Sequence, residues 1–262
     1  MNSHKIGFWQ LFLLAFLLTF IVQMIHETGH WAIYQSYGRG PVWGFIGLVQ
    51  LWDTPPLQPA EWVKTSLPDG EQGWLRLTSP INSKVEEIIS AAAGPIASLL
   101  GAVLGLLLVY RSKDRPIKQI GLTLTLITSF TMSLYYLRSP LRTGGDEYAI
   151  AFQLGIAKSL IEIPFAIAFI ACLIWGVREL ETWKIRLPWL AVILFNSISI
   201  GLTLNYVDIF LRSQVNESNP LFRPVLGFSL PVVIVNSLAF LGLWIWWYMM
   251  RKSLSLPQEK TG

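Results

Sequence analysis

Charged residues are scarce in this sequence, and histidine and cysteine are scarcer still. Asp, Glu, Lys and Arg together make up 14% of the 262 residues, whereas soluble domains carry about 25%. Hydrophobic residues account for 53% of the chain, and the mean hydropathy is +0.49. This balance is typical of an integral membrane protein, whose partner is the lipid bilayer itself.

The shortage of cysteine and of basic clusters excludes further classes of protein. The single cysteine, Cys172, cannot form a disulfide within the chain or build a cysteine-based zinc site. The net charge of +4 comes without any dense run of Lys or Arg, so nothing indicates binding to nucleic acid. The apolar run after Lys5 is longer than the core of a signal peptide and shows no cleavage site before His26. We therefore expect it to remain as a helix.

Apolar segments long enough to cross a bilayer occur about six times, since a spanning helix needs about 20 mostly apolar residues. They are Gly7–Tyr34, Glu87–Tyr110, Ile117–Leu137, Leu160–Val177, Pro188–Tyr206 and Val225–Met250. We predict an all-α polytopic membrane protein, placed as a multi-pass protein in a prokaryotic cell membrane. Lys and Arg are divided almost evenly between the two sets of loops, so the orientation stays open.

The one long connection, residues 38–86, is rich in Trp, Pro and Gly. Its first part, PVWGFIGLVQLW, combines strand-forming residues with spaced glycines. Two interpretations stay open here: a small β-hairpin at or in the membrane surface, and an ordinary loop outside the membrane. The polar residues after Lys252 are expected to form a disordered tail.

Three ionisable residues, His26, Glu27 and His30, lie within one turn of the first apolar segment. A charged side chain near the centre of a membrane helix costs about 2.5–3.5 kcal/mol on insertion, so such a cluster needs a reason. The spacing is that of the H-E-x-x-H motif, in which two histidines on one helix face bind one metal ion. Zn²⁺ is the expected ion, and it needs a third protein ligand beside an open position. Glu27 is then placed to move a proton between water and a leaving amine.

The third ligand has to come from a distant part of the chain, because the remaining histidine, His4, precedes the first helix. Asp146 is favoured, since Gly144 and Gly145 before it let the backbone approach closely. Two alternatives stay open at this position. Asp146 could instead cap a short helix, and Glu147 could be the ligand.

Topology also favours Asp146. The first helix leaves the membrane near His30, and the third helix enters from the opposite side. His30 and Asp146 should therefore lie toward the same face of the membrane. Pro140, at the end of the third helix, is expected to bend or break the helix there.

The segment AAAGPIASLLGAVLG contains small residues at every fourth position, which favours close helix packing. These residues are Ala93, Ala97, Gly101 and Gly105. Gly94 and Pro95 are expected to interrupt the helix and expose backbone groups to a substrate strand. With Gly145, they are the candidate substrate-binding residues, and packing alone is the alternative role.

Taken together, HETGH at 26–30, AGP at 93–95 and the region from Pro140 to Asp146 resemble the site-2 protease family of intramembrane zinc metalloproteases. The resemblance covers the first three helices, somewhat over half of the chain. It differs in that Ser139 precedes the proline where the family commonly has Asn, and Glu147 follows the aspartate where it commonly has Gly.

The resemblance implies a three-helix catalytic core within residues 1–160. Hydropathy predicts additional transmembrane helices in 161–252, and composition predicts the disordered tail at 253–262. It implies that His26, His30 and Asp146 bind zinc. Glu27 would be the catalytic acid and base. The implied substrate is a membrane-anchored protein, cut within or near its transmembrane helix.

The main alternative is a polytopic membrane protein that is not an enzyme, such as a metal-binding regulator or a transporter. Other intramembrane proteases fit less well. A serine type needs a histidine after His30, and the sequence has none. An aspartyl type would pair Asp146 with Asp208 but has Thr143 where such enzymes use glycine. Membrane desaturases with two irons need more than the three histidines present.

Overall fold

The computed structural model describes residues 6–38, 41–43, 49–51, 62–66, 72–76, 83–141, 144–216, 219, 221 and 230–255. Within these residues, six helices are long and apolar enough to cross a membrane. They are α1 (Phe8–Ser36), α2 (Lys84–Arg111), α3 (Arg115–Arg138), α5 (Ser159–Arg178), α6 (Trp183–Asn216) and α7 (Leu230–Ser255). The prediction of a helical protein that crosses the membrane about six times is confirmed.

Some helix ends differ from those expected. Helix α6 continues to Asn216, ten residues beyond the apolar segment that predicted it. Helix α7 runs to Ser255, so the prediction that a disordered tail begins at residue 253 is wrong, and residues 256–262 lie outside the described residues. The start of the last predicted segment, residues 225–229, also lies outside them. Hydropathy marks the apolar centre of a span, whereas polar turns at its ends can stay helical.

Short elements fill the connections. After α3 a 3-10 turn covers Ser139–Leu141, and helix α4 spans Asp146–Leu154. The expected break at Pro140 is confirmed, since α3 ends at Arg138. In the first long connection two antiparallel strand pairs are described. They are β1 (Pro41–Trp43) with β2 (Val49–Leu51), and β3 (Trp62–Ser66) with β4 (Gln72–Arg76). Residues 44–48, which would close a hairpin between β1 and β2, lie outside the described residues.

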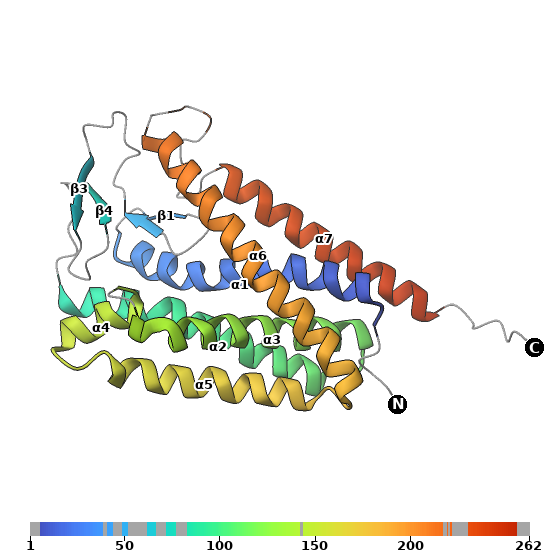
Figure 1. Ribbon diagram of the computed structural model, residues 1–262. Coiled ribbons are helices and arrows are strands. Elements are labelled where there is room, and N and C mark those ends of the chain that lie inside the picture. Colours follow the sequence, from blue (N-terminus) through green and yellow to red (C-terminus); the bar gives the residue numbers. More distant parts are fainter. Residues whose placement is uncertain are drawn as a thin grey trace, which may run out of the picture.

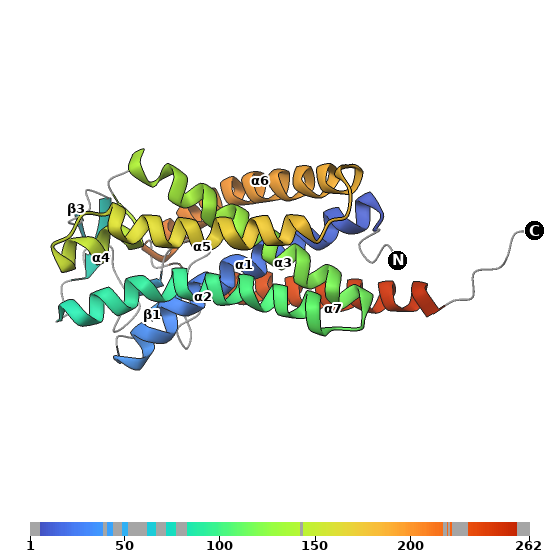
Figure 2. The same ribbon diagram turned by 90° about the horizontal axis from the view of Figure 1, so that it is seen from below.

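Helices α1 and α3 form the centre of the bundle. Helix α1 packs against α2, α3, α6 and α7, while α3 packs against α2, α5 and α6. In Figure 1, α2, α3 and α5 run together below α1, α6 runs diagonally across α1, and α7 lies above α1. Figure 2, seen from below, agrees that α4 and the strands lie at one end of the bundle, where α1 ends.

The core of the bundle is apolar and so is much of its outside. Leu14 and Leu18 of α1 pack with Ile127 of α3 and Ile193 of α6, and all four are at most 1% exposed. Outward-facing side chains such as those of Leu100, Leu104 and Leu107 on α2 are about half exposed or more. A surface of this kind would be unusual in water. It is expected where lipid surrounds the helices.

Small residues let α2 approach both of its neighbours closely. A Cβ atom added at Gly105 would lie 2.5 Å from the carbonyl oxygen of Gly121 on α3. The Thr125 hydroxyl donates to the carbonyl oxygen of Ala102 at 2.9 Å across the same contact. The predicted close packing is therefore confirmed at Gly105.

The prediction that Gly94 and Pro95 interrupt the helix is wrong. Helix α2 is continuous from Lys84 to Arg111, with Pro95 inside it. Proline removes one backbone donor. Neighbouring helices on both sides hold the remaining turns in place.

Candidate metal centre

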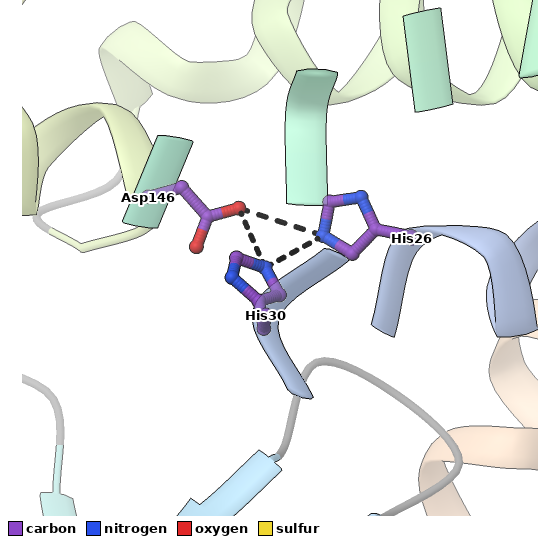
Figure 3. A group of neighbouring side chains, drawn as sticks. All are labelled: His26, His30 and Asp146. Atoms are coloured by element: carbon purple, nitrogen blue, oxygen red, sulfur yellow. Dashed lines mark hydrogen bonds and ion pairs between the residues drawn. The ribbon is translucent and has the colours of Figure 1, made fainter. Parts of the chain in front are cut away.

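The candidate metal centre begins with two histidines one turn apart on α1. His26 and His30 face α2, and their Nε2 atoms lie 3.3 Å apart. The two rings meet edge to face, with centroids 5.0 Å apart. Both nitrogens point toward the same small volume (Figure 3).

Asp146 completes the group from the start of α4. Its Oδ2 atom lies 3.5 Å from the Nε2 atom of His26 and 3.5 Å from that of His30. The structure thus brings together the three residues that the sequence predicted as ligands, with all their ligand atoms within 4.8 Å of one another. The alternative in which Asp146 caps the helix is wrong, because Gly145 occupies the N-cap position.

The backbone before Asp146 requires glycine. Gly145 has φ +113° and ψ 170°, a combination that residues with a Cβ atom rarely adopt. This conformation turns the chain from the end of α3 into α4, and so directs Asp146 toward α1. A substrate-binding role for Gly145 stays a prediction.

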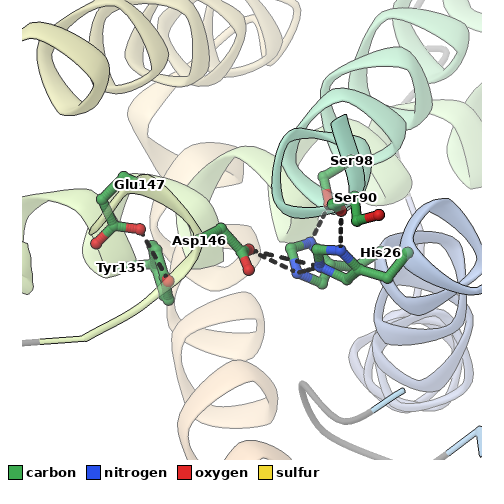
Figure 4. Close-up of polar contacts among 7 residues, drawn as sticks. His26, Ser90, Ser98, Tyr135, Asp146 and Glu147 are labelled. Carbon is green, nitrogen blue, oxygen red and sulfur yellow. Dashed lines mark hydrogen bonds and ion pairs between the residues drawn. The ribbon is translucent and has the colours of Figure 1, made fainter. Parts of the chain in front are cut away.

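The outer nitrogens of both rings are held by α2 (Figure 4). Nδ1 of His30 lies 2.7 Å from the carbonyl oxygen of Ser90, and Nδ1 of His26 lies 3.0 Å from the hydroxyl oxygen of Ser98. A carbonyl oxygen can only accept, so Nδ1 of His30 carries a proton, and in the neutral ring Nε2 then presents its lone pair. Such contacts fix the ring orientation and tautomer of a metal-binding histidine.

Sequence reasoning missed these two serines. Ser90, Gly94 and Ser98 are spaced by four residues, so they share one face of α2. That spacing could have suggested them once the antiparallel pairing of α1 with α2 was known.

Two glycines make this pairing possible. A Cβ atom added at Gly94 would lie 2.1 Å from Nε2 of His30, and one added at Gly29 would lie 2.2 Å from the carbonyl oxygen of Ala93. Real Cβ contacts essentially never come this close. Gly94 is therefore buried beneath a candidate ligand, and Pro95 beside it is buried as well. Their predicted role in substrate binding stays a prediction, but their burial gives both a packing role.

Glu27 and Glu147, which each follow a candidate ligand in the chain, have different surroundings. Glu27 is completely buried, which is costly for a carboxylate unless charged or polar groups surround it. Glu147 is also buried, but it points away from the histidines, toward Tyr135, whose hydroxyl donates to its Oε2 atom at 3.0 Å (Figure 4). The group that converges therefore contains Asp146 and not the alternative ligand Glu147.

The charge state of Asp146 suits a ligand. Burial works to raise the pKa of its carboxyl, but the neighbouring His30 and His26 outweigh burial and hold that pKa below its usual range. The carboxylate is therefore ionised at neutral pH. When both imidazoles have lost the proton at Nε2, two nitrogen lone pairs and a negative oxygen face one another, which favours a cation between them.

The donor set and its dimensions fit zinc. Zinc bonds to imidazole nitrogen and carboxylate oxygen are about 2.0–2.2 Å long, so tetrahedral donors lie about 3.3–3.5 Å from one another. The separations here are 3.3, 3.5 and 3.5 Å. Three protein donors also leave a fourth position open, as catalytic zinc sites do.

Comparison of the whole chain with family models, with characterised proteins and with solved structures finds no match in any of the three.

Proposed function

We propose that this protein is an intramembrane zinc metalloprotease, similar to the site-2 proteases, that cuts membrane-anchored proteins. The observation that carries the proposal is the convergence of His26, His30 and Asp146 beside the buried Glu27. His30 lies six residues before the end of α1, which is roughly 9 Å of helix. The centre therefore lies inside a membrane-spanning helix and near one of its ends.

Each residue has a distinct role in this proposal. His26, His30 and Asp146 would hold the zinc ion, which would polarise a peptide carbonyl and activate water at neutral pH. Glu27 accepts a proton from the attacking water and passes it to the leaving amine. Its complete burial excludes bulk water from around the carboxylate, which strengthens its electrostatic effect on nearby groups.

Cleavage in reconstituted membranes tests this proposal. The full chain is placed in proteoliposomes with a panel of tagged single-span proteins, and product bands are quantified. Glu27→Gln should lower the cleavage rate about 100-fold to 10,000-fold, because the proton carrier is lost. It should keep the zinc content of the wild type.

Glu181→Gln is the matched control, because Glu181 is an exposed carboxylate between α5 and α6. It should cleave at the wild-type rate. If Glu27→Gln cleaves as fast as the wild type at equal expression, or if the wild type binds zinc but cuts no member of the panel, the metal-binding regulator is the better description.

A further inference from the structure

A second group of residues, three charged and one polar, lies behind Asp146, on the side away from the histidines. Ser139, Glu147, Lys158 and Glu162 form it, and they are called the Lys158 cluster below. Ser139, Glu147 and Glu162 are 0%, 1% and 7% exposed. These residues come together only in the folded chain, because Ser139 follows the last residue of α3 and Glu147 is the second residue of α4. Lys158 directly precedes α5, and Glu162 lies in the first turn of that helix.

Lys158 connects the three other members. Its Nζ atom lies 3.1 Å from Oε1 of Glu162 and 3.6 Å from Oε1 of Glu147. It also donates to the carbonyl oxygen of Ser139 at 2.9 Å. One positive charge thus lies between two buried carboxylates and a backbone oxygen, which offsets part of the cost of burying them.

The Ser139 hydroxyl contacts the same two carboxylates. Its Oγ atom is hydrogen-bonded to Oε1 of Glu147, and it lies 2.5 Å from Oε1 of Glu162. Ser139 and Glu147 stand on either side of the connection from α3 to α4 that ends at Asp146. Their contact therefore holds the two ends of that connection together.

The position of Asp146 follows from this arrangement. Glu147 is the next residue on the same helix turn, so a displacement of its side chain and backbone would displace Asp146 as well. The Oδ2 atom of Asp146 has to stay about 3.5 Å from both imidazoles, and metal sites tolerate errors of only a few tenths of an ångström. Without Lys158, the two carboxylates would repel each other in a place with little water.

We propose that Lys158 and Glu162 are positioning residues of the metal centre, which act through Ser139 and Glu147 to hold Asp146 at its ligand position. Helix α5 then takes part in the site, although it lies outside the three helices that carry the motifs. This inference rests on the metal centre of the proposed function and not on proteolysis.

Metal binding by the purified full chain tests the inference. Metal-free protein in detergent is titrated with Co²⁺, whose visible absorption reports the ligand geometry, and Zn²⁺ is measured by competition. Lys158→Met should bind both ions about 10-fold to 100-fold more weakly, the range found when partners of metal ligands are removed. Its Co²⁺ spectrum should change, which a loss of stability alone would not cause. Lys158→Arg, which keeps the charge, should restore most of the affinity.

Lys113→Met is the matched control, because Lys113 is exposed in the turn between α2 and α3, and it should bind metal like the wild type. If Lys158→Met does not fold, Glu162→Gln replaces it, with an expected loss of about 10-fold. Wild-type affinity and spectrum in Lys158→Met, or in Glu162→Gln when it is the variant used, would overturn the inference. If the wild type binds metal but cleaves no substrate, the proposed protease function is wrong. The metal affinities of the variants still decide whether Lys158 and Glu162 position Asp146.

Discussion

Both histidines of the candidate metal centre are in contact with α2 through the ring nitrogen that faces away from Asp146. Each imidazole directs Nε2 toward Asp146, while its Nδ1 lies within hydrogen-bond distance of an oxygen atom of α2. The two oxygens differ in kind: one is the Ser98 hydroxyl, and the other is the backbone carbonyl of Ser90. The difference allows a matched test with two buried serines of the same helix.

Ser98→Ala should weaken zinc binding about 10-fold to 100-fold, because His26 loses the oxygen that orients its ring. Ser90→Ala should leave zinc binding close to that of the wild type, since the carbonyl oxygen that His30 uses is still present. Competition titration of the metal-free proteins measures both. Equal losses in the two variants would show that these hydrogen bonds do not control the affinity.

The close contact between α1 and α2 depends on two glycines, one on each helix, because any larger residue would collide with the other helix. Gly29 and Gly94 lie where the two helices are nearest, and a methyl group at either would meet atoms closer than 2.3 Å. The H-E-x-x-H spacing alone would put two imidazoles on a helix face. The glycines let a second helix come close enough to hold them.

Gly94→Ala should abolish high-affinity zinc binding, a loss of about 100-fold or more, because the added methyl group overlaps Nε2 of His30. Gly201→Ala on α6 is the control, since nothing lies within 4 Å of a Cβ atom there. That variant should bind zinc normally and be unchanged or slightly more stable, as alanine favours helices by up to about 1 kcal/mol. Normal zinc affinity in Gly94→Ala would mean that α2 can move away from α1 at little cost.

Five helices contribute to the candidate metal centre. Its candidate ligands come from α1 and α4, and the residues that support them come from α2, α3 and α5. A metal ion that binds the folded chain should therefore stabilise the arrangement of all five helices and not one local loop.

Zinc at 100 times its dissociation constant should raise the free energy of unfolding by about 2.7 kcal/mol and should raise the melting temperature in detergent. A chelator should reverse the shift. His26→Ala should show no zinc-dependent shift, because one donor is missing. If zinc does not change the melting temperature of the wild type, a metal centre at this place is contradicted.

Spacing along the chain was sufficient for most features that depend on neighbouring residues. Long apolar runs predict the spans, and the 3.6-residue helix period places His26 and His30 on one face with Glu27 beside them. Pro140 predicts the end of α3 for the same reason, since its ring acts on the preceding turn. The same local reasoning was wrong about Gly94 and Pro95, because packing against two neighbouring helices keeps α2 continuous.

Contacts between residues far apart in the sequence required the folded chain. Asp146 could be favoured from its flanking glycines, but its choice over Glu147 depends on which side of α4 faces α1. The partners Ser90 and Ser98 and the cluster around Lys158 carry no motif that marks them. The physical reason is that helix period is a property of a single segment, whereas the pairing of helix faces depends on where small side chains let separate segments meet.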